Sequence, residues 1–88
     1  MKILVKNFGA ILNSRPAGRE AVLAIKAYLT PPTHDKIELD FTGVISVGPS
    51  WLDEVLTFLY TEYGKDRVTC LPTNNSSIIE SLKIINKE

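Results

Sequence analysis

The sequence predicts an α/β fold in which a mixed, mostly parallel β-sheet of about four strands is covered, mainly on one face, by about three helices. Two observations lead to this prediction. Apolar segments typical of strands alternate along the chain with segments whose apolar residues recur at helical spacing. The chain also has 88 residues, of which 44% are hydrophobic, and this suits a single domain over residues 1–88 with one core.

The first half of the chain reads as a strand, a helix and a second strand. Residues 3–5 begin a strand, and residues 8–12 are either its continuation after a turn or its hairpin partner. Ser14 or Arg15 is expected to cap a helix that residues 30–32 end with two prolines. Residues 36–41 alternate apolar and polar side chains, as a half-buried strand does. The helix is expected to bury one stripe of side chains, namely Ala17, Ala21, Ala24, Ile25 and Tyr28.

The second half begins with a connector over residues 44–47 and a helix that opens at Pro49 and Ser50. Gly64 is placed to cap the end of this helix, and residues 67–71 read as the next strand. Ser77 and Glu80 have the spacing of a capping box for a last helix. The second helix has the clearest helical periodicity, at Leu52, Val55, Leu56, Leu59 and Tyr63, and the last helix repeats it at Ile78, Leu82 and Ile85.

Charge and hydropathy exclude several classes of protein. Ten Lys and Arg balance ten Asp and Glu to a formal charge of +0, so no basic surplus is available to neutralise the phosphates of a nucleic acid. The longest unbroken apolar run, residues 21–25, is far shorter than the roughly 18 residues that span a bilayer. A single cysteine, Cys70, gives no sign of an oxidising compartment. We therefore expect a cytoplasmic protein that contacts neither nucleic acid nor membrane.

Residues that could support catalysis or hold a metal are scarce. His34 is the only histidine and Cys70 the only cysteine, whereas a zinc site usually needs three or more such ligands. Gly43, Gly48 and Gly64 fit neither phosphate-binding glycine pattern. The sequence therefore predicts no catalytic residues, no metal and no cofactor, and we do not expect an enzyme.

The most informative segment is residues 39–56, where a strand ends and Ser50 stands at the expected N-cap of the second helix. Asp53 follows three residues later, as in a variant of the capping box. One interpretation is purely structural, since an N-cap serine contributes about 1 kcal/mol. The other is a phosphorylation switch, because the positive end of a helix dipole tolerates an added phosphate. Both interpretations stay open at this point.

Trp51 lies at the edge of the apolar stripe of the second helix, and Phe58 follows seven residues later. Glu54 and Glu62 flank Phe58 at a spacing of four residues on either side. Half-exposed aromatic side chains rimmed by acids would suit a docking strip, because tryptophan is enriched among interface hot spots. The alternative is that Trp51 fills the core beside the sheet.

Arg15 and Arg19 are expected near the same end of the sheet as Ser50. There they could contact an anion, and with Gly48 and Ser50 they could line a pocket for a small ligand or a nucleotide. The alternative is that both arginines are solvated surface charges.

Three segments together resemble a known family. Residues 39–44, LDFTGV, and residues 49–54, PSWLDE, resemble the "LDF-x-GV … PSF-x-DE" core of a bacterial family of STAS-like domains of unknown function. Residues 14–18, SRPAG, resemble the "SR-x-x-G" element upstream of that core. The family is distantly similar to STAS domains, typified by anti-sigma factor antagonists. The resemblance implies a STAS-like sheet with helices on one face.

The resemblance also implies a function in partner-switching signal transduction. Antagonists are phosphorylated by a kinase-type anti-sigma factor on a serine that corresponds to Ser50, although they carry Asp-Ser-Ser-Gly where this chain has GPSW at residues 48–51. Such domains are often found beside GHKL-type ATPases and in prophages. We expect a non-catalytic regulatory module that docks a protein partner, a GHKL-type kinase or ATPase, through the N-terminal half of the second helix. The partner-binding residues would be Trp51, Asp53, Glu54 and Phe58.

Two alternatives accompany this expectation. The first is a STAS-like module that senses a small ligand or nucleotide through Arg15, Arg19 and Gly48. The second concerns assembly, since pairing of the N-terminal edge strand with a second copy would give a homodimer.

Overall fold

The computed structural model describes residues 1–28 and 35–86, and all of its described strand pairings are parallel. A three-stranded sheet has the order β1-β3-β5, from β1 (Lys2–Leu4), β3 (Ile37–Asp40) and β5 (Val68–Cys70). A second, two-stranded sheet pairs β2 (Ile11–Leu12) with β4 (Ser46–Val47). The predicted parallel α/β fold is confirmed, although the strands form two small sheets rather than one.

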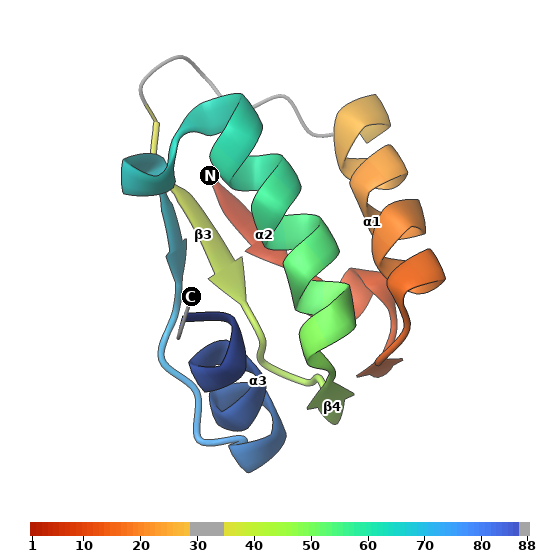
Figure 1. The fold of residues 1–88 in the computed structure, drawn as a ribbon. Coiled ribbons are helices and arrows are strands. Elements are labelled where there is room, and N and C mark those ends of the chain that lie inside the picture. The colour runs from red at the N-terminus through yellow and green to blue at the C-terminus, as the bar shows by residue number, and fades with distance from the viewer. Residues whose placement is uncertain (29–34, 87–88) are drawn as a thin grey trace.

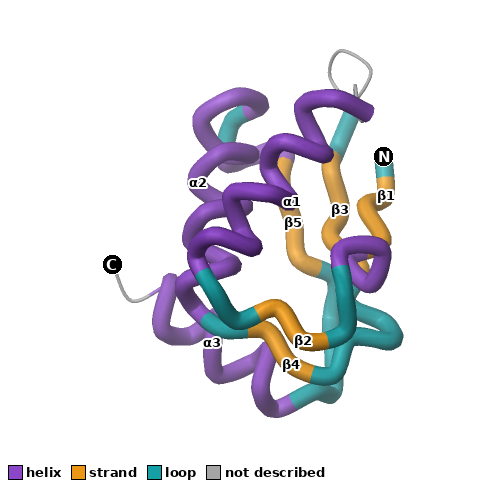
Figure 2. The backbone as a smooth tube through the Cα atoms, turned by 90° about the vertical axis from the view of Figure 1, so that its right-hand side faces the viewer, coloured by secondary structure: helices purple, strands orange, loops and turns teal. Residues whose placement is uncertain are grey.

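The helices gather mainly on one side of the larger sheet (Figure 1). α1 (Arg15–Tyr28) and α2 (Pro49–Tyr63) run side by side in the same direction, as right-handed crossovers between parallel strands require. Figure 2 places both of them on the same side of β1, β3 and β5, and α3 (Ser76–Asn86) near the β2–β4 pair. Two short 3₁₀ helices, η1 (Val5–Phe8) and η2 (Lys65–Arg67), complete the elements.

The core lies between the three-stranded sheet and the two long helices. Alternate strand residues point into it, so Ile3, Ile37 and Leu39 are buried while their neighbours Lys2 and Glu38 are exposed or half-buried. The predicted periodicity of α2 is confirmed at four of its positions, because the side chains of that stripe are at most 1% exposed: Leu52, Val55, Leu56 and Leu59.

The structure decides two points about the strands. Of the two interpretations of residues 8–12, the hairpin with β1 is wrong, because η1 carries the chain across to the second sheet, where Ile11 pairs with Ser46. The segment at residues 44–47 is not only a connector, since it contains β4. Strands of two residues leave no alternating pattern that a sequence could reveal.

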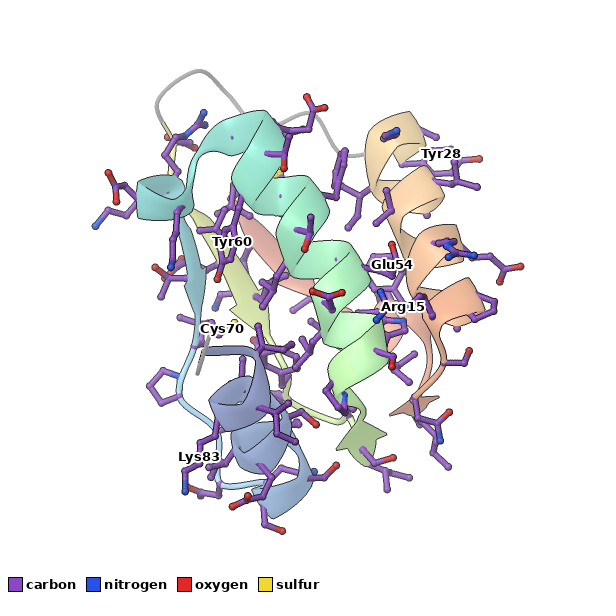
Figure 3. The ribbon with its side chains drawn as sticks, viewed as in Figure 1. Arg15, Tyr28, Glu54, Tyr60, Cys70 and Lys83 are labelled. Carbon is purple, nitrogen blue, oxygen red and sulfur yellow. The ribbon has the colours of Figure 1, made fainter. Side chains whose placement is uncertain are left out.

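The ends of the helices agree with the sequence in part. The Ser14 hydroxyl accepts a hydrogen bond from the Ala17 amide at 3.2 Å, and this confirms the predicted cap of α1. Gly64 closes α2 with a positive φ of 92°, as predicted. The stripe predicted for α1 is wrong at Tyr28, which is 84% exposed and points away from α2 (Figure 3). The predicted end of α1 at residues 30–32 and His34 lie outside the described residues.

α3 is capped by Asn75 rather than by the predicted Ser77–Glu80 box. The Asn75 side-chain oxygen accepts hydrogen bonds from the amides of Ser77 and Ile78, at 2.9 and 3.4 Å, while its amide nitrogen donates to the carbonyl oxygen of Ile45 at 2.7 Å. The Ser77 hydroxyl instead accepts from the Val47 amide at 3.3 Å. The polar start of α3 therefore holds the outer edge of β4.

Candidate functional site

The candidate site lies where β4 passes into α2. Gly48, not Ser50, is the N-cap of α2, and Pro49 follows at the first helical position, which proline favours. Ser50 makes no capping hydrogen bond. The purely structural interpretation of Ser50 as an N-cap is therefore wrong, because the preference of Pro49 sets where the helix begins.

Gly48 is required by packing. A Cβ atom at this position would lie 3.2 Å from the Asn13 Cα and 3.3 Å from the Asn13 Cβ. The Gly48 amide also donates to the carbonyl oxygen of Leu12 at 2.8 Å. Gly48 thus keeps β4 close to the segment that precedes α1.

Arg15 joins the first turn of α1 to the first turns of α2. Its guanidinium lies 2.9 Å from an Asp53 carboxylate oxygen and 3.1 Å from a Glu54 carboxylate oxygen. The side-chain hydrogen bonds to Asp53 and then Glu54 raise the pKa of Arg15 above its ordinary value. Arg19 adds a second contact to Glu54 at 3.4 Å. Figure 3 shows Arg15 and Glu54 pointing toward one another across the two helices.

Three of the predicted site residues line one cavity. Arg15, Ser50 and Asp53 enclose about 200 Å³ together with Pro49 and two isoleucines of α3, Ile84 and Ile85. Arg19 and Gly48 do not line it. Ligand pockets usually measure roughly 300–1,000 Å³, so this cavity is small for a nucleotide. Its main feature is a half-buried serine near a guanidinium that already binds two carboxylates.

Trp51 belongs to the core, and its predicted role as an exposed docking anchor is wrong. It is 1% exposed and packs with Phe8 at a ring-centroid distance of 6.2 Å. The Trp51 backbone lies close to α1, since a Cβ atom at Gly18 would lie only 3.0 Å from the Trp51 carbonyl oxygen and 3.2 Å from its Cα. Among the described residues, the Trp51 indole N–H has no hydrogen-bond partner. The alternative interpretation, that Trp51 fills the core, is the one the structure supports.

Phe58 and the acidic residues of the predicted strip reach the surface. Asp53 is 48% and Glu54 23% exposed at the side chain, and Phe58 is half-buried. The Lys26 ammonium lies 5.3 Å from the centre of the Phe58 ring, a cation–π contact between the two helices. The surface of α2 therefore carries two acidic side chains and the Phe58 ring, and basic side chains of α1 contact each of them.

The segment at residues 39–44 leads from β3 toward β4 and so helps to position the start of α2. An Asp40 carboxylate oxygen accepts a hydrogen bond from the Thr42 amide at 2.9 Å, and this bond holds the pKa of Asp40 below its ordinary value. Gly43 takes a positive φ of 86° in the turn, while Phe41 and Val44 are buried on either side. These residues fix the path from β3 to β4 and therefore the start of α2.

The described residues contain no group of three or more His, Cys, Asp or Glu side chains that could hold a metal ion. Burial raises the pKa of the Cys70 thiol to about 11, so this thiol is protonated near neutral pH. None of the described helices has both the length and the apolar character needed to cross a membrane.

Sequence reasoning missed Asn75 and Ser81, which fasten α3 to β4. The Ser81 hydroxyl is buried and donates to the Val47 carbonyl oxygen. An asparagine directly before an apolar helical pattern is a capping signal that could have identified Asn75. Ser81 gave no such signal, since a serine within a helix usually faces solvent.

Comparison with known proteins gives one match. A family model described as the STAS-like domain of unknown function (DUF4325) matches residues 24–87, well over half of the chain. The match includes the segments at residues 39–44 and 49–54 but begins after the segment at residues 14–18. Neither a curated protein nor a solved structure matches the chain.

Proposed function

Because the chain belongs to the family of STAS-like domains of unknown function, we propose that it is a non-catalytic regulatory module that docks a protein partner through the N-terminal half of α2. The observation that carries this proposal is the exposed cavity in which Ser50 of α2 stands beside Arg15 of α1. The partner-binding residues are Ser50, Asp53, Glu54 and Phe58. Trp51 supports this surface from the core.

The partner we propose is a GHKL-type ATPase with kinase activity, in accordance with the STAS resemblance. Ser50 is the second residue of α2, where the backbone amides and the positive end of the helix dipole favour a negative group. Phosphorylation would add a charge of about −1.5 to −2 at pH 7. That charge would face both Arg15 and Asp53, so it would change the electrostatics of the docking surface without entering the core.

The experiment compares partner binding by charge variants of α2. A GHKL-type ATPase domain is titrated into the wild-type chain, Ser50→Asp and Thr61→Asp, and the Kd is measured by calorimetry. Thr61→Asp is the matched control, because Thr61 lies on α2, about three turns after Ser50, and is not among the residues that line the cavity. We expect Ser50→Asp to raise the Kd at least about tenfold and Thr61→Asp to change it little.

Two results would contradict the proposal. Equal effects of the two aspartates would show that Ser50 has no special place, and equal binding by wild type and Ser50→Asp would remove the switch. Sensing of a small ligand is the alternative, and the same chains can be screened with nucleotides and small anions by thermal shift. A ligand at a hundredfold excess over its Kd stabilises by about 2.7 kcal/mol, a shift that is easily measured.

A further inference from the structure

A groove between α1 and α2 forms an outward-facing surface of the molecule. It measures about 440 Å³ and is lined by Arg19, Val22, Leu23, Glu54, Thr57 and Phe58. In Figure 1 the two helices run parallel toward the top of the view, and no other described element crosses in front of them. Leu23 lines this groove and is 63% exposed, so it presents apolar surface to solvent there.

The two walls of the groove carry opposite charges. On α1, Arg15, Arg19 and Lys26 recur at a spacing of four and seven residues and form a basic wall. The acids Asp53 and Glu54 lie on α2, where they accept the contacts from Arg15 and Arg19. Glu62 extends this acidic wall by two turns, and the apolar side chains lie between the two walls.

We propose that the α1–α2 groove is the interface of a homodimer whose twofold axis runs along the groove. Rotation about this axis places α1 of each copy over α2 of the other, at the same height along the helices. Each basic wall then faces an acidic wall, and each Leu23 lies over Thr57 and Phe58 of the second copy. An isologous interface needs a surface that is complementary to itself, and two parallel walls of opposite charge satisfy this condition.

The arrangement of charges also selects this axis over its alternative. A twofold axis perpendicular to the helices would place α1 on α1 and α2 on α2, so like charges would meet, at a cost in free energy. Thr57 and Thr61, which are exposed on α2, are small enough to let a second helix approach. The formal charge of +0 leaves no long-range repulsion between copies.

The intrachain ion pairs do not prevent this association. Arg15, Arg19 and Asp53 are 43–64% exposed at the side chain, and exposed pairs of this kind contribute little to stability. Their carboxylates can therefore accept contacts from a second copy at small cost. The dimer does not depend on phosphorylation of Ser50, but it covers Glu54 and Phe58, so dimer formation and the proposed partner would compete for that part of α2.

The test is sedimentation equilibrium of the whole chain from about 10 μM to about 1 mM, a range that detects a weak dimer. We expect a reversible dimer for the wild type and a monomer for Leu23→Glu. Ile45→Glu is the matched control, because Ile45 is 64% exposed but follows β3 far from the groove, and this variant should still dimerise. Circular dichroism confirms that each variant is folded.

A charge swap tests the axis. Lys26→Glu should weaken the dimer at least about tenfold, and the double variant Lys26→Glu with Glu62→Lys should restore it, since the swapped charges face one another across the axis. A wild type that is monomeric at about 1 mM would overturn the proposal. A dimer that persists in Leu23→Glu but not in Ile45→Glu would overturn it as well, because the interface would then lie elsewhere.

Discussion

Replacing Gly18 by alanine should destabilise the protein, although this change normally stabilises a helix. Within a helix, alanine is favoured over glycine by about 0.8–1.0 kcal/mol. At Gly18, however, the new Cβ atom would lie 2.9 Å from the Glu54 Cβ and 3.0 Å from the Trp51 carbonyl oxygen. These atoms belong to α2 close to its backbone and cannot rotate away, so α1 and α2 must separate.

The expected magnitude follows from these two opposing effects. Overpacking of a tight contact typically costs about 1–3 kcal/mol, and separation of the helices also weakens the Arg15 contacts with Asp53 and Glu54. With the intrinsic gain of about 0.8–1.0 kcal/mol subtracted, overpacking leaves a net loss of up to about 2 kcal/mol. For a domain of this size that corresponds to a decrease in Tm of up to roughly 15 °C.

The assay is urea denaturation followed by circular dichroism, with Ala27→Gly as the control. Ala27 is exposed on the same helix, so its replacement should cost only the intrinsic preference of about 0.8–1.0 kcal/mol. Gly18→Ala and Ala27→Gly should therefore both destabilise, although they are opposite substitutions. A Gly18→Ala variant more stable than the wild type would refute the close approach of α1 and α2.

The remaining predictions concern Trp51 and Cys70. Trp51→Phe removes an unpaired buried N–H, which is worth about 1–3 kcal/mol, and leaves a cavity that costs a similar amount, so the free energy of unfolding should stay within about 1 kcal/mol of the wild type. Trp51→Ala should lose about 3–5 kcal/mol, and equal losses in the two variants, measured by denaturation, would indicate that the indole N–H is bonded. Cys70 in the folded protein should react with iodoacetamide at pH 8 about a hundredfold more slowly than in urea, because burial raises its pKa from 9.0 to about 11. Since the folded state disfavours the thiolate, the stability that the Cys70 thiol contributes is present below pH 9 and is lost as the pH rises toward 11. The free energy of unfolding of the wild type should therefore fall relative to that of Cys70→Ala over this pH range. A constant difference between the two would contradict the raised pKa.

The sequence predicted the elements in which buried apolar residues recur at a regular spacing along the chain. α2 is buried along one stripe from Leu52 to Leu59, and that requirement is visible in the spacing of its leucines. β4 and its pairing with β2 were missed because each strand has only two residues, and the pairing depends on the path that η1 gives the chain. Tyr28 was misplaced because its helical phase fits the buried stripe, whereas in the structure it lines a surface hollow beside β1 and stays 84% exposed.

The site was predictable in its location but not in its contacts. Parallel strands joined by single helices bring the starts of α1 and α2 to one end of the sheet, so the proximity of Arg15 to Ser50 followed from topology. The burial of Trp51 did not, because its indole packs against the ring of Phe8, which is far away in the sequence. Such contacts between distant segments have no signature in the local spacing of residues.

The fastening of α3 to β4 has a consequence for the solubility of the chain. Backbone groups along the outer edge of a strand are a template for pairing with another chain, and edges left open favour aggregation. Here the Ser77 and Ser81 hydroxyls bond to the amide and carbonyl groups of Val47 in β4, and the Asn75 side chain bonds to the carbonyl oxygen of Ile45 just before it. α3 thus satisfies the backbone hydrogen-bonding groups at the edge of the small sheet. Any event that detached α3 would leave these groups open to pairing with another chain.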